Sequence, residues 1–422
     1  MIIDLAGPGM PSGLDADIVI IGSGVAGLLL ASRLRERGRR IVVLESGGRE
    51  TTDRTDALNE VKNVGRVYCG ASRGRARRLG GTSTLWGGAM LPFFCEDMVA
   101  RPLLGIEGWP VSIDSVTPYL KDIHDLFGLD RGSLEEDFVG KRVGRADIPV
   151  GDPDFVARFA KWPRFRDRNF AALFRSRIER DPELVVMLNA TATNFHLDVD
   201  SGRVAAVTAS AIAGPRIAVR GRDIVICAGA IETTRLLLRL HRHEPRIAPV
   251  GEAVLGRYLF DHILAQLAHV EPAEPSRPNR LAGHRFVGRT MRSFRLELTP
   301  GAQARARLPS AWAHVATATD AETGVDSLRD LLRGRQRTGR IDPAAVMRAC
   351  RYLPYFVRLA AWRVIRGQLL WPSSSRYDLH LVTAFPTGAG ANPTLMLMLF
   401  TLRLADKLAS SWSSQNAATA KA

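Results

Sequence analysis

Residues 17–45, DIVIIGSGVAGLLLASRLRERGRRIVVLE, carry the strongest structural signal in the chain. The apolar run 18–21 predicts a short buried strand, and 25–37 predicts the helix that follows it. Between them the sequence reads G-x-G-x-x-G, with glycines at Gly22, Gly24 and Gly27. The next apolar run, 41–44, predicts a second strand, which ends at Glu45. This order of strand, turn, helix and strand predicts a parallel α/β unit of the Rossmann type.

Each part of this motif has a role in binding a dinucleotide. Gly22 permits the tight turn, Gly24 lets the backbone approach a pyrophosphate, and Gly27 lets the helix pack closely on the strand. The first N–H groups of the helix would face the phosphates. Glu45 can accept hydrogen bonds from a ribose diol and argues against a 2′-phosphate, which favours FAD or NAD over NADP. A merely structural glycine turn is the alternative interpretation, and the order of elements argues against it.

The composition limits the class of protein. The chain has 422 residues, 46% of them hydrophobic, which is enough for a large core and for two domains. It contains no run of about 18 apolar residues, so we expect no membrane span. The first 16 residues do not resemble a signal peptide. The cysteines lack C-x-x-C spacing, which predicts free thiols in a reducing cytoplasm and no metal site; they are Cys69, Cys95, Cys227 and Cys350.

The net charge of +15 comes from arginines spread along the chain, with dense groups at 73–78 and 333–340. One interpretation is an anionic partner such as nucleic acid or membrane lipid. The other is a basic composition with solvated faces. We favour the second interpretation and expect no nucleic-acid partner, because no nucleic-acid-binding motif accompanies the charge.

A second glycine-rich segment, 79–88, reads LGGTSTLWGG. Its glycines would let the backbone lie against a flat or anionic ligand, although a structural loop explains the composition equally well when the segment is taken alone. Together with the first motif, RARRLGGTSTLWGG resembles the glucose–methanol–choline (GMC) oxidoreductases. Three further segments agree, in the order the family has them: 188–195 (LNATATNF), 223–238 (DIVICAGAIETTRLLL) and 385–394 (FPTGAGANPT).

The resemblance implies an α/β fold with a discontinuous Rossmann-like FAD-binding domain and an α+β substrate domain built on an antiparallel sheet. The expected pieces, in chain order, are FAD-binding 1–100, substrate 101–180, FAD-binding 181–262, substrate 263–376, and a C-terminal FAD-contacting segment with its tail at 377–422. Within the last piece, 395–408 is expected to be a helix and 411–422 a frayed tail.

Local patterns agree with this architecture. Segment 223–226 predicts a strand, and 231–240 predicts an amphipathic helix. Segments 185–188 and 203–219 alternate in a manner suited to antiparallel strands. Segment 347–370 combines aromatic residues and arginines at helical spacing, which predicts a cover helix of the substrate domain; a membrane-surface helix is the alternative.

The resemblance also implies a reaction and its cofactor. It implies oxidation of a CH–OH group of an alcohol, sugar or natural product by hydride transfer to flavin N5. Asn392 matches a catalytic position whose amide can hydrogen-bond the substrate oxygen but cannot act as a base. Leu85 stands where some relatives attach the flavin to a histidine, so FAD is expected to be non-covalent. The expected cofactor contacts are Gly22, Gly24, Gly27, Glu45, Gly80, Gly81, Thr82, Ser83, Trp86, Gly87, Ala192, Gly229, Pro393 and Thr394.

The base histidine of the family has no counterpart in this sequence. Segment 377–382 resembles a substrate-domain strand, and the chain then enters the C-terminal turn directly, as if an internal piece were deleted. Residues 379–382 could also serve as the last strand of the FAD-binding domain. His262 and His380 are candidate bases by position, and a structural histidine is the favoured interpretation of both.

Three interpretations follow. The first is an FAD-dependent GMC oxidoreductase acting on a small-molecule alcohol or sugar. The second is a catalytically impaired or degenerate FAD-binding protein. The third is an NAD-dependent dehydrogenase, against which LGGTSTLWGG and FPTGAGANPT argue. The electron acceptor and the substrate are left open by the sequence.

Overall fold

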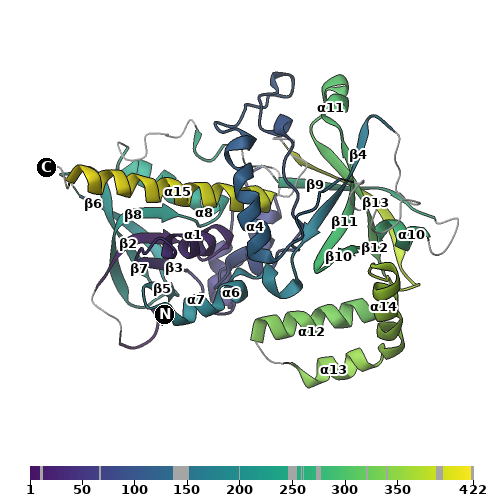
Figure 1. Cartoon of the computed structure of the whole chain (residues 1–422). Coiled ribbons are helices and arrows are strands. Elements are labelled where there is room, and N and C mark those ends of the chain that lie inside the picture. The colour runs from purple at the N-terminus through teal and green to yellow at the C-terminus, as the bar shows by residue number, and fades with distance from the viewer. Residues whose placement is uncertain are drawn as a thin grey trace. The chain divides into compact units, whose positions relative to one another are not determined.

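The computed structural model describes residues 1–9, 13–65, 68–135, 152–198, 200–245, 254–257, 259, 261–271, 277–319, 322–338, 341–385 and 393–419. The chain divides into two units, each described separately below (Figure 1). Unit 1 contains Met1–Gly87, Asp167–Leu259 and Phe400–Ala422, and unit 2 contains Gly88–Arg166 and Phe260–Leu399. The expected domain boundaries at residues 100, 180, 262 and 376 stay a prediction.

Unit 1 is built on a seven-stranded sheet, counted over the described residues, with the order β1-β5-β3-β2-β8-β7-β6. Its strands are β1 Ile2–Asp4, β2 Gly13–Ile21, β3 Ile41–Leu44, β5 Leu184–Leu188, β6 Thr191–Asp198, β7 Arg203–Ser210 and β8 Arg216–Ile226. Strands β1, β5, β3, β2 and β8 pair in parallel, and β7 pairs antiparallel with both β8 and β6. The predicted Rossmann-like α/β arrangement is confirmed.

One strand differs from the expectation. Strand β5 lies between β1 and β3 and is parallel to both, whereas the alternation of 185–188 predicted an antiparallel strand. Four of its five residues are buried, because it sits inside the sheet. A strand that is covered on both faces has apolar residues on both, so its sequence does not show whether it pairs in parallel or antiparallel.

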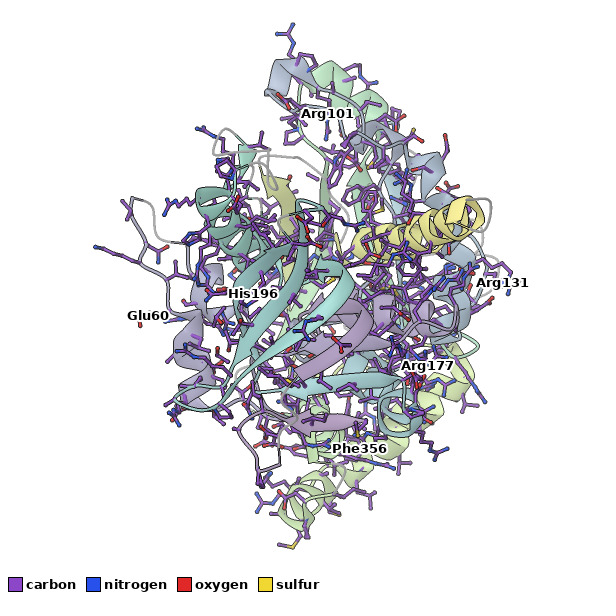
Figure 2. All side chains as sticks on the ribbon, turned by 90° about the vertical axis from the view of Figure 1, so that its left-hand side faces the viewer. Glu60, Arg101, Arg131, Arg177, His196 and Phe356 are labelled. Atoms are coloured by element: carbon purple, nitrogen blue, oxygen red, sulfur yellow. The ribbon has the colours of Figure 1, made fainter. Side chains whose placement is uncertain are left out.

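The helices of unit 1 surround this sheet. They are α1 Val25–Arg35, α2 Asp53–Asp56, η1 Ala57–Asn59, α3 Gly70–Arg73, η2 Gly81–Thr84, α6 Phe170–Leu173, α7 Arg175–Arg180 and α8 Ala230–His243. Helix α1 buries Leu28, Leu30 and Leu34 completely or nearly so. Arg177 of α7, labelled in Figure 2, donates to the Ser32 hydroxyl of α1 at 2.9 Å. The predicted helices at 25–37 and 231–240 are therefore present.

The C-terminal helix α15, Pro393–Thr419, runs beside the sheet of unit 1 from Phe400 onward (Figure 1). Trp412 is 2% exposed, and its indole N–H donates to Asp223 Oδ2 at 2.6 Å. Arg39 stacks on the same ring at 4.4 Å. The expected frayed tail is therefore wrong as far as Thr419, because a buried tryptophan holds this part of the helix in place.

Unit 2 is built on a six-stranded sheet of the described residues, in the order β10-β11-β12-β13-β9 with β4 also paired to β11. Its strands are β4 Phe155–Trp162, β9 Asp261–His269, β10 Arg285–Val287, β11 Thr290–Leu298, β12 Ala311–Ala318 and β13 Arg376–Phe385. Each pairing in this sheet is antiparallel, as predicted for the substrate domain. Because β13 lies between β12 and β9, the alternative that 379–382 completes the FAD-binding sheet is wrong.

The two sides of β13 differ. β12 pairs with β13 on one side, whereas β9 ends the sheet on the other. β9 carries large apolar side chains that are half exposed or more: Ile263, Leu264 and Leu267.

The 3-10 helices of unit 2 are η3 Cys95–Asp97, η4 Pro102–Leu104, η5 Ile113–Ser115 and η6 Thr117–Tyr119. Its α-helices are α4 Leu120–Phe127, α10 Arg277–Ala282, α11 Pro300–Ala306, α12 Gly324–Thr338, α13 Pro343–Cys350 and α14 Leu353–Arg366. The 3-10 helix η7, Phe165–Arg168, contains the sequence boundary between the two units at residue 166. The helical pattern predicted at 347–370 is thus divided between α13 and α14. Arg363 of α14 stacks on the Phe286 ring of β10 at 3.9 Å, although no residue of α14 is buried.

Candidate dinucleotide-binding site

The three glycines of the first motif serve two different purposes. Gly22 has a φ of 106°, and a Cβ there would lie 2.5 Å from the Cys227 carbonyl oxygen. A Cβ at Gly27 would lie 1.9 Å from the Gly22 carbonyl oxygen. Backbone packing therefore requires glycine at both positions. At Gly24 a Cβ would meet no described atom within 4 Å, so this position faces open space, which is what the approach of a pyrophosphate needs.

Glu45 lies directly against this turn. Its carboxylate is buried, and its Oε2 accepts from the Ser23 backbone N–H at 3.0 Å and from the Ser23 hydroxyl at 2.6 Å. Oε1 accepts from the Gly47 N–H at 2.9 Å and has only a long 3.4 Å contact with the Ser46 hydroxyl. Burial raises the pKa of Glu45, and the hydrogen bonds and the charge of Arg77 oppose that rise. Oε1 is thus the oxygen with spare capacity to accept a hydrogen bond.

Ser23 also joins the second glycine-rich segment to the first. Its hydroxyl accepts from the Gly80 N–H at 3.2 Å. A Cβ at Gly81 would lie 3.0 Å from Gly24 Cα, and one at Gly47 would lie 2.0 Å from the Arg77 carbonyl oxygen. Three segments far apart in the sequence therefore meet at the Gly24 turn. Ser23 was not among the predicted site residues, although a serine between two motif glycines is the one side chain of that turn able to hydrogen-bond Glu45.

The rest of segment 79–88 has mixed surroundings. Ser83 is buried; its hydroxyl donates to the Gly80 carbonyl at 2.6 Å and accepts from the Phe170 N–H at 3.0 Å, so it holds the shape of the loop. Thr82 and Gly87 are exposed, and the Trp86 ring lies 6.4 Å from that of Phe170. Cofactor contacts by these residues stay a prediction.

The remaining predicted site residues lie on separate elements. Ala192 is buried in β6, and Gly229, with a φ of 80°, precedes α8. Pro393 and Thr394 begin α15. Asn392 lies outside the described residues, so its catalytic role stays a prediction.

The arginines next to the site are paired inside the protein. Arg75 Nη1 and Arg77 Nη2 each lie 2.9 Å from Glu232 Oε1, on the first turn of α8. Burial alone would raise the pKa of Glu232, and the arginines hold it below the usual value. Arg78 is also buried and donates to the Arg49 carbonyl at 2.9 Å. The expectation of a solvated face is therefore wrong for these three arginines, because they join the 73–78 segment to the rest of unit 1.

The two candidate bases both lie in unit 2. His262 is the second residue of β9, with Nδ1 3.6 Å from Asp261 Oδ1. His380 lies in β13 opposite His314 of β12, and their rings are 5.5 Å apart. In the described part of the chain, no group of three His, Cys, Asp or Glu side chains is arranged to hold a metal ion. None of the described helices is both long and apolar enough to cross a membrane.

Comparisons with known proteins agree with this geometry. A family profile described as "NAD(P)-binding Rossmann-like domain" matches residues 20–79. The oxygen-dependent choline dehydrogenases of Rhizobium rhizogenes and Rhizobium meliloti are 32% and 33% identical to the chain over 138 residues. These likenesses support the resemblance of this chain to the GMC oxidoreductases. Each of these alignments covers 28% of this chain and 24% of the length of the curated relative.

Solved structures similar to this chain include two oxidases. Pyridoxine 4-oxidase from Mesorbium loti is 17% identical, with coverage of 92% of this chain and 80% of that one and a TM-score of 0.39. The R554K formate oxidase of Aspergillus oryzae RIB40 is 13% identical, with coverage of 93% and 80% and a TM-score of 0.41.

Proposed function

We propose that this chain is an FAD-dependent GMC oxidoreductase that oxidises the CH–OH group of a small alcohol, sugar or natural-product hydroxyl. The observation that carries the proposal is the meeting of Gly24, Glu45 and Gly80 around the Ser23 hydroxyl. This arrangement gives one open backbone position for a pyrophosphate beside one buried carboxylate for a ribose.

The residues present fit the dinucleotide part of FAD. Gly24 would allow the pyrophosphate to approach the first N–H groups of α1, which favour negative charge. Glu45 Oε1 would accept a hydrogen bond from a ribose hydroxyl, and its negative charge would repel a 2′-phosphate. When bound, the flavin supplies the hydride acceptor for alcohol oxidation. Leu85 is 59% exposed and has no nucleophilic atom, which supports non-covalent binding.

The test is the absorbance spectrum of the purified protein, followed by acid precipitation. We expect flavin bands near their usual visible wavelengths and release of all flavin to the supernatant. A colourless protein that cannot be reconstituted with FAD would contradict the proposal. Flavin that remains with the pellet would contradict the non-covalent part alone.

A second candidate is a GMC protein that binds FAD but turns over alcohols poorly. The observation that favours it is the chain path: β13 reaches Phe385 and α15 begins at Pro393, with only residues 386–392 between them. No histidine follows His380 in the sequence. Without a positioned base, proton removal from the alcohol loses a contribution on the order of 10²–10⁴-fold.

Anaerobic flavin reduction across a panel of alcohols and sugars separates the two candidates. Fast bleaching supports the first candidate, and its loss in His380→Ala or His262→Ala would identify the base. A flavin that stays oxidised with every compound, although a chemical reductant bleaches it, supports the second.

A further inference from the structure

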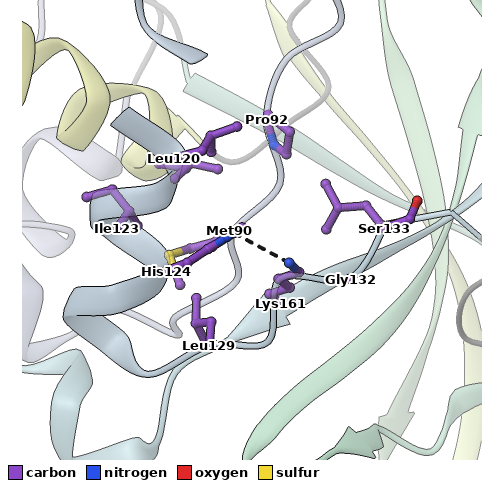
Figure 3. A pocket seen from close by; sticks show the side chains of 11 residues that line it. Met90, Pro92, Leu120, Ile123, His124, Leu129, Gly132, Ser133 and Lys161 are labelled. Atoms are coloured by element: carbon purple, nitrogen blue, oxygen red, sulfur yellow. Dashed lines mark hydrogen bonds between the residues drawn. The ribbon is translucent and has the colours of Figure 1, made fainter. Parts of the chain in front are cut away.

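A cavity of about 170 Å³ lies within unit 2, between helix α4 and the strand β4 (Figure 3). Its wall is mostly apolar and includes Met90, Leu120, Ile123 and Leu129. Two side chains with titratable nitrogen atoms, His124 and Lys161, also line it. A largely apolar cavity with few polar groups is the usual form of a small-molecule site.

The Lys161 amine is held at a fixed position beside this cavity. Lys161 is 2% exposed, and its Nζ donates to the Asp130 carbonyl oxygen at 2.7 Å. The same Nζ lies 3.4 Å from His124 Nε2. A neutral amine has two N–H donors and one lone pair. With its N–H groups directed to Asp130 and His124, the lone pair is the remaining reactive position.

The Asp130 carboxylate is not the ion-pair partner of Lys161, because Arg292 already binds both of its oxygens. Arg292 Nε donates to Asp130 Oδ2 at 3.2 Å, and Arg292 Nη2 binds the other carboxylate oxygen. Lys161 contacts the carbonyl of Asp130, and none of the described carboxylates forms an ion pair with it. The lysine is thus a buried amine rather than one half of a salt bridge.

The electrostatic surroundings make this amine easier to deprotonate than an ordinary lysine. Burial and the charge of Arg292 together lower the pKa of Lys161 to about 8, although the charge of Asp130 opposes this change. Burial also lowers the pKa of His124 to about 4, helped by the charge of Lys161, so the imidazole is neutral at pH 7. A neutral imidazole with Nδ1 protonated can accept the N–H of Lys161 at Nε2.

We propose that Lys161 is a carbonyl-reactive amine, and that the cavity admits a small apolar aldehyde that forms an imine with it. Desolvated lysines next to a second cation are the lysines that act as nucleophiles. Only six of the 58 lysines and arginines in this chain are lysines. A position that required only a positive charge would therefore more often hold an arginine. Arginine stays charged and has no lone pair for this reaction. The inference goes beyond the proposed oxidation and requires no flavin.

The reaction balances without any oxidant or reductant. The Nζ lone pair forms a C–N bond to the carbonyl carbon while the C=O π pair moves to oxygen. That oxygen gains a proton as nitrogen loses one, with His124 Nε2 as the nearest acceptor. The resulting carbinolamine loses its hydroxyl group and the remaining nitrogen proton as water, and the nitrogen lone pair forms the C=N bond. One aldehyde and one amine therefore give one imine and one water.

The experiment treats the full chain with butanal and cyanoborohydride at pH 7.5, which reduces the imine to a stable alkyl group. Mass spectrometry of peptides then gives the labelling rate of each lysine. Lys121 is the internal reference, because its side chain is 66% exposed on helix α4. We expect Lys161 to be labelled at least 5-fold faster than Lys121. Equal or slower labelling of Lys161 would overturn the proposal.

Two further experiments test whether the labelling of Lys161 depends on the cavity or only on the general reactivity of the amine. Leu120→Trp fills part of the cavity wall at a half-buried position and should slow the labelling of Lys161 at least 5-fold, with Lys121 unchanged. Pyrene carboxaldehyde is too large for about 170 Å³ and should show no preference for Lys161. Unchanged labelling in Leu120→Trp, or a preference for the large aldehyde, would overturn the role of the cavity.

Discussion

The Ser23 hydroxyl donates a 2.6 Å hydrogen bond to Oε2 of Glu45, and the two residues are 22 positions apart in the sequence. The same hydroxyl accepts the N–H of Gly80, so one oxygen atom holds three segments of the site. A buried carboxylate that already has its partners keeps one orientation when a ligand is absent. We therefore expect the proposed dinucleotide site to need little rearrangement when a ligand binds.

Removal of this hydroxyl should cost stability. Ser23→Ala leaves Glu45 with one fewer donor and the Gly80 N–H without its acceptor, and both groups are buried. We expect a loss of about 1–3 kcal/mol in the free energy of unfolding, measured with urea. Ser72→Ala is the control, because its exposed hydroxyl makes only a long 3.4 Å contact, and it should change stability by less than about 0.5 kcal/mol. Equal effects of the two changes would contradict this account.

Substitutions at two glycines of the first motif should separate an effect on FAD binding from an effect on folding. Gly24→Val adds a side chain in open space, so the apoprotein should keep its melting temperature while FAD binding is lost. Gly27→Ala places a Cβ 1.9 Å from the Gly22 carbonyl oxygen, so it should reduce the melting temperature or prevent folding. Flavin absorbance per protein and thermal unfolding of the apoprotein measure the two effects. Bound FAD in Gly24→Val would show that the cofactor lies elsewhere.

Unit 2 should lose stability in acid through His314. Burial, together with the charges of Arg295, His380 and His284, lowers the pKa of His314 to about 3. The unfolded chain takes up the proton near pH 6.5 and the folded chain does not. The stability is therefore complete above pH 6.5 and is lost as the pH falls toward 3. Between pH 6.5 and pH 4 this loss is on the order of 3 kcal/mol.

The measurement is the free energy of unfolding of wild type and His314→Phe over that pH range. His124 contributes a slope of the same sign, since its pKa is also lowered, and it remains in both proteins. The variant should show the shallower slope. Identical slopes would mean that His314 takes up its proton in the folded state near the ordinary pH.

The end of helix α15 should contribute strongly to stability. Trp412→Ala removes a buried indole, its hydrogen bond to Asp223 and its stacking with Arg39. We expect a loss of about 3–5 kcal/mol. Ser411→Ala, at an exposed neighbouring position, should change stability by less than about 0.5 kcal/mol. A small effect of Trp412→Ala in chemical unfolding would restore the expectation of a frayed tail.

Local sequence was enough to predict the β2–α1–β3 unit, because the glycine spacing and the apolar runs concern residues that are neighbours in the chain. It was also enough to place Glu45 at the turn. The direction of β5 was not predictable from alternation, since its neighbours β1 and β3 come from distant parts of the chain.

The other features that the sequence did not predict also involve residues whose partners are distant in the chain. The composition shows that Arg75 and Arg77 are charged, but only the fold brings Glu232 next to them. Trp412 looks like part of a polar tail until Asp223 and Arg39 are placed beside it. In the same way, nothing in the sequence around Lys161 indicates that Arg292 occupies the Asp130 carboxylate.

The exposed strand β9 has a consequence for how this protein behaves at high concentration. No described strand pairs with its outer edge, so this edge can pair with the same edge of another molecule, which would give Ile263, Leu264 and Leu267 new apolar neighbours without any unfolding. Precipitation of this kind proceeds from the native state, so its onset depends on the protein concentration and little on the melting temperature. Additives that only suppress unfolding would leave the solubility limit where it is, whereas a charged residue on the edge would raise it.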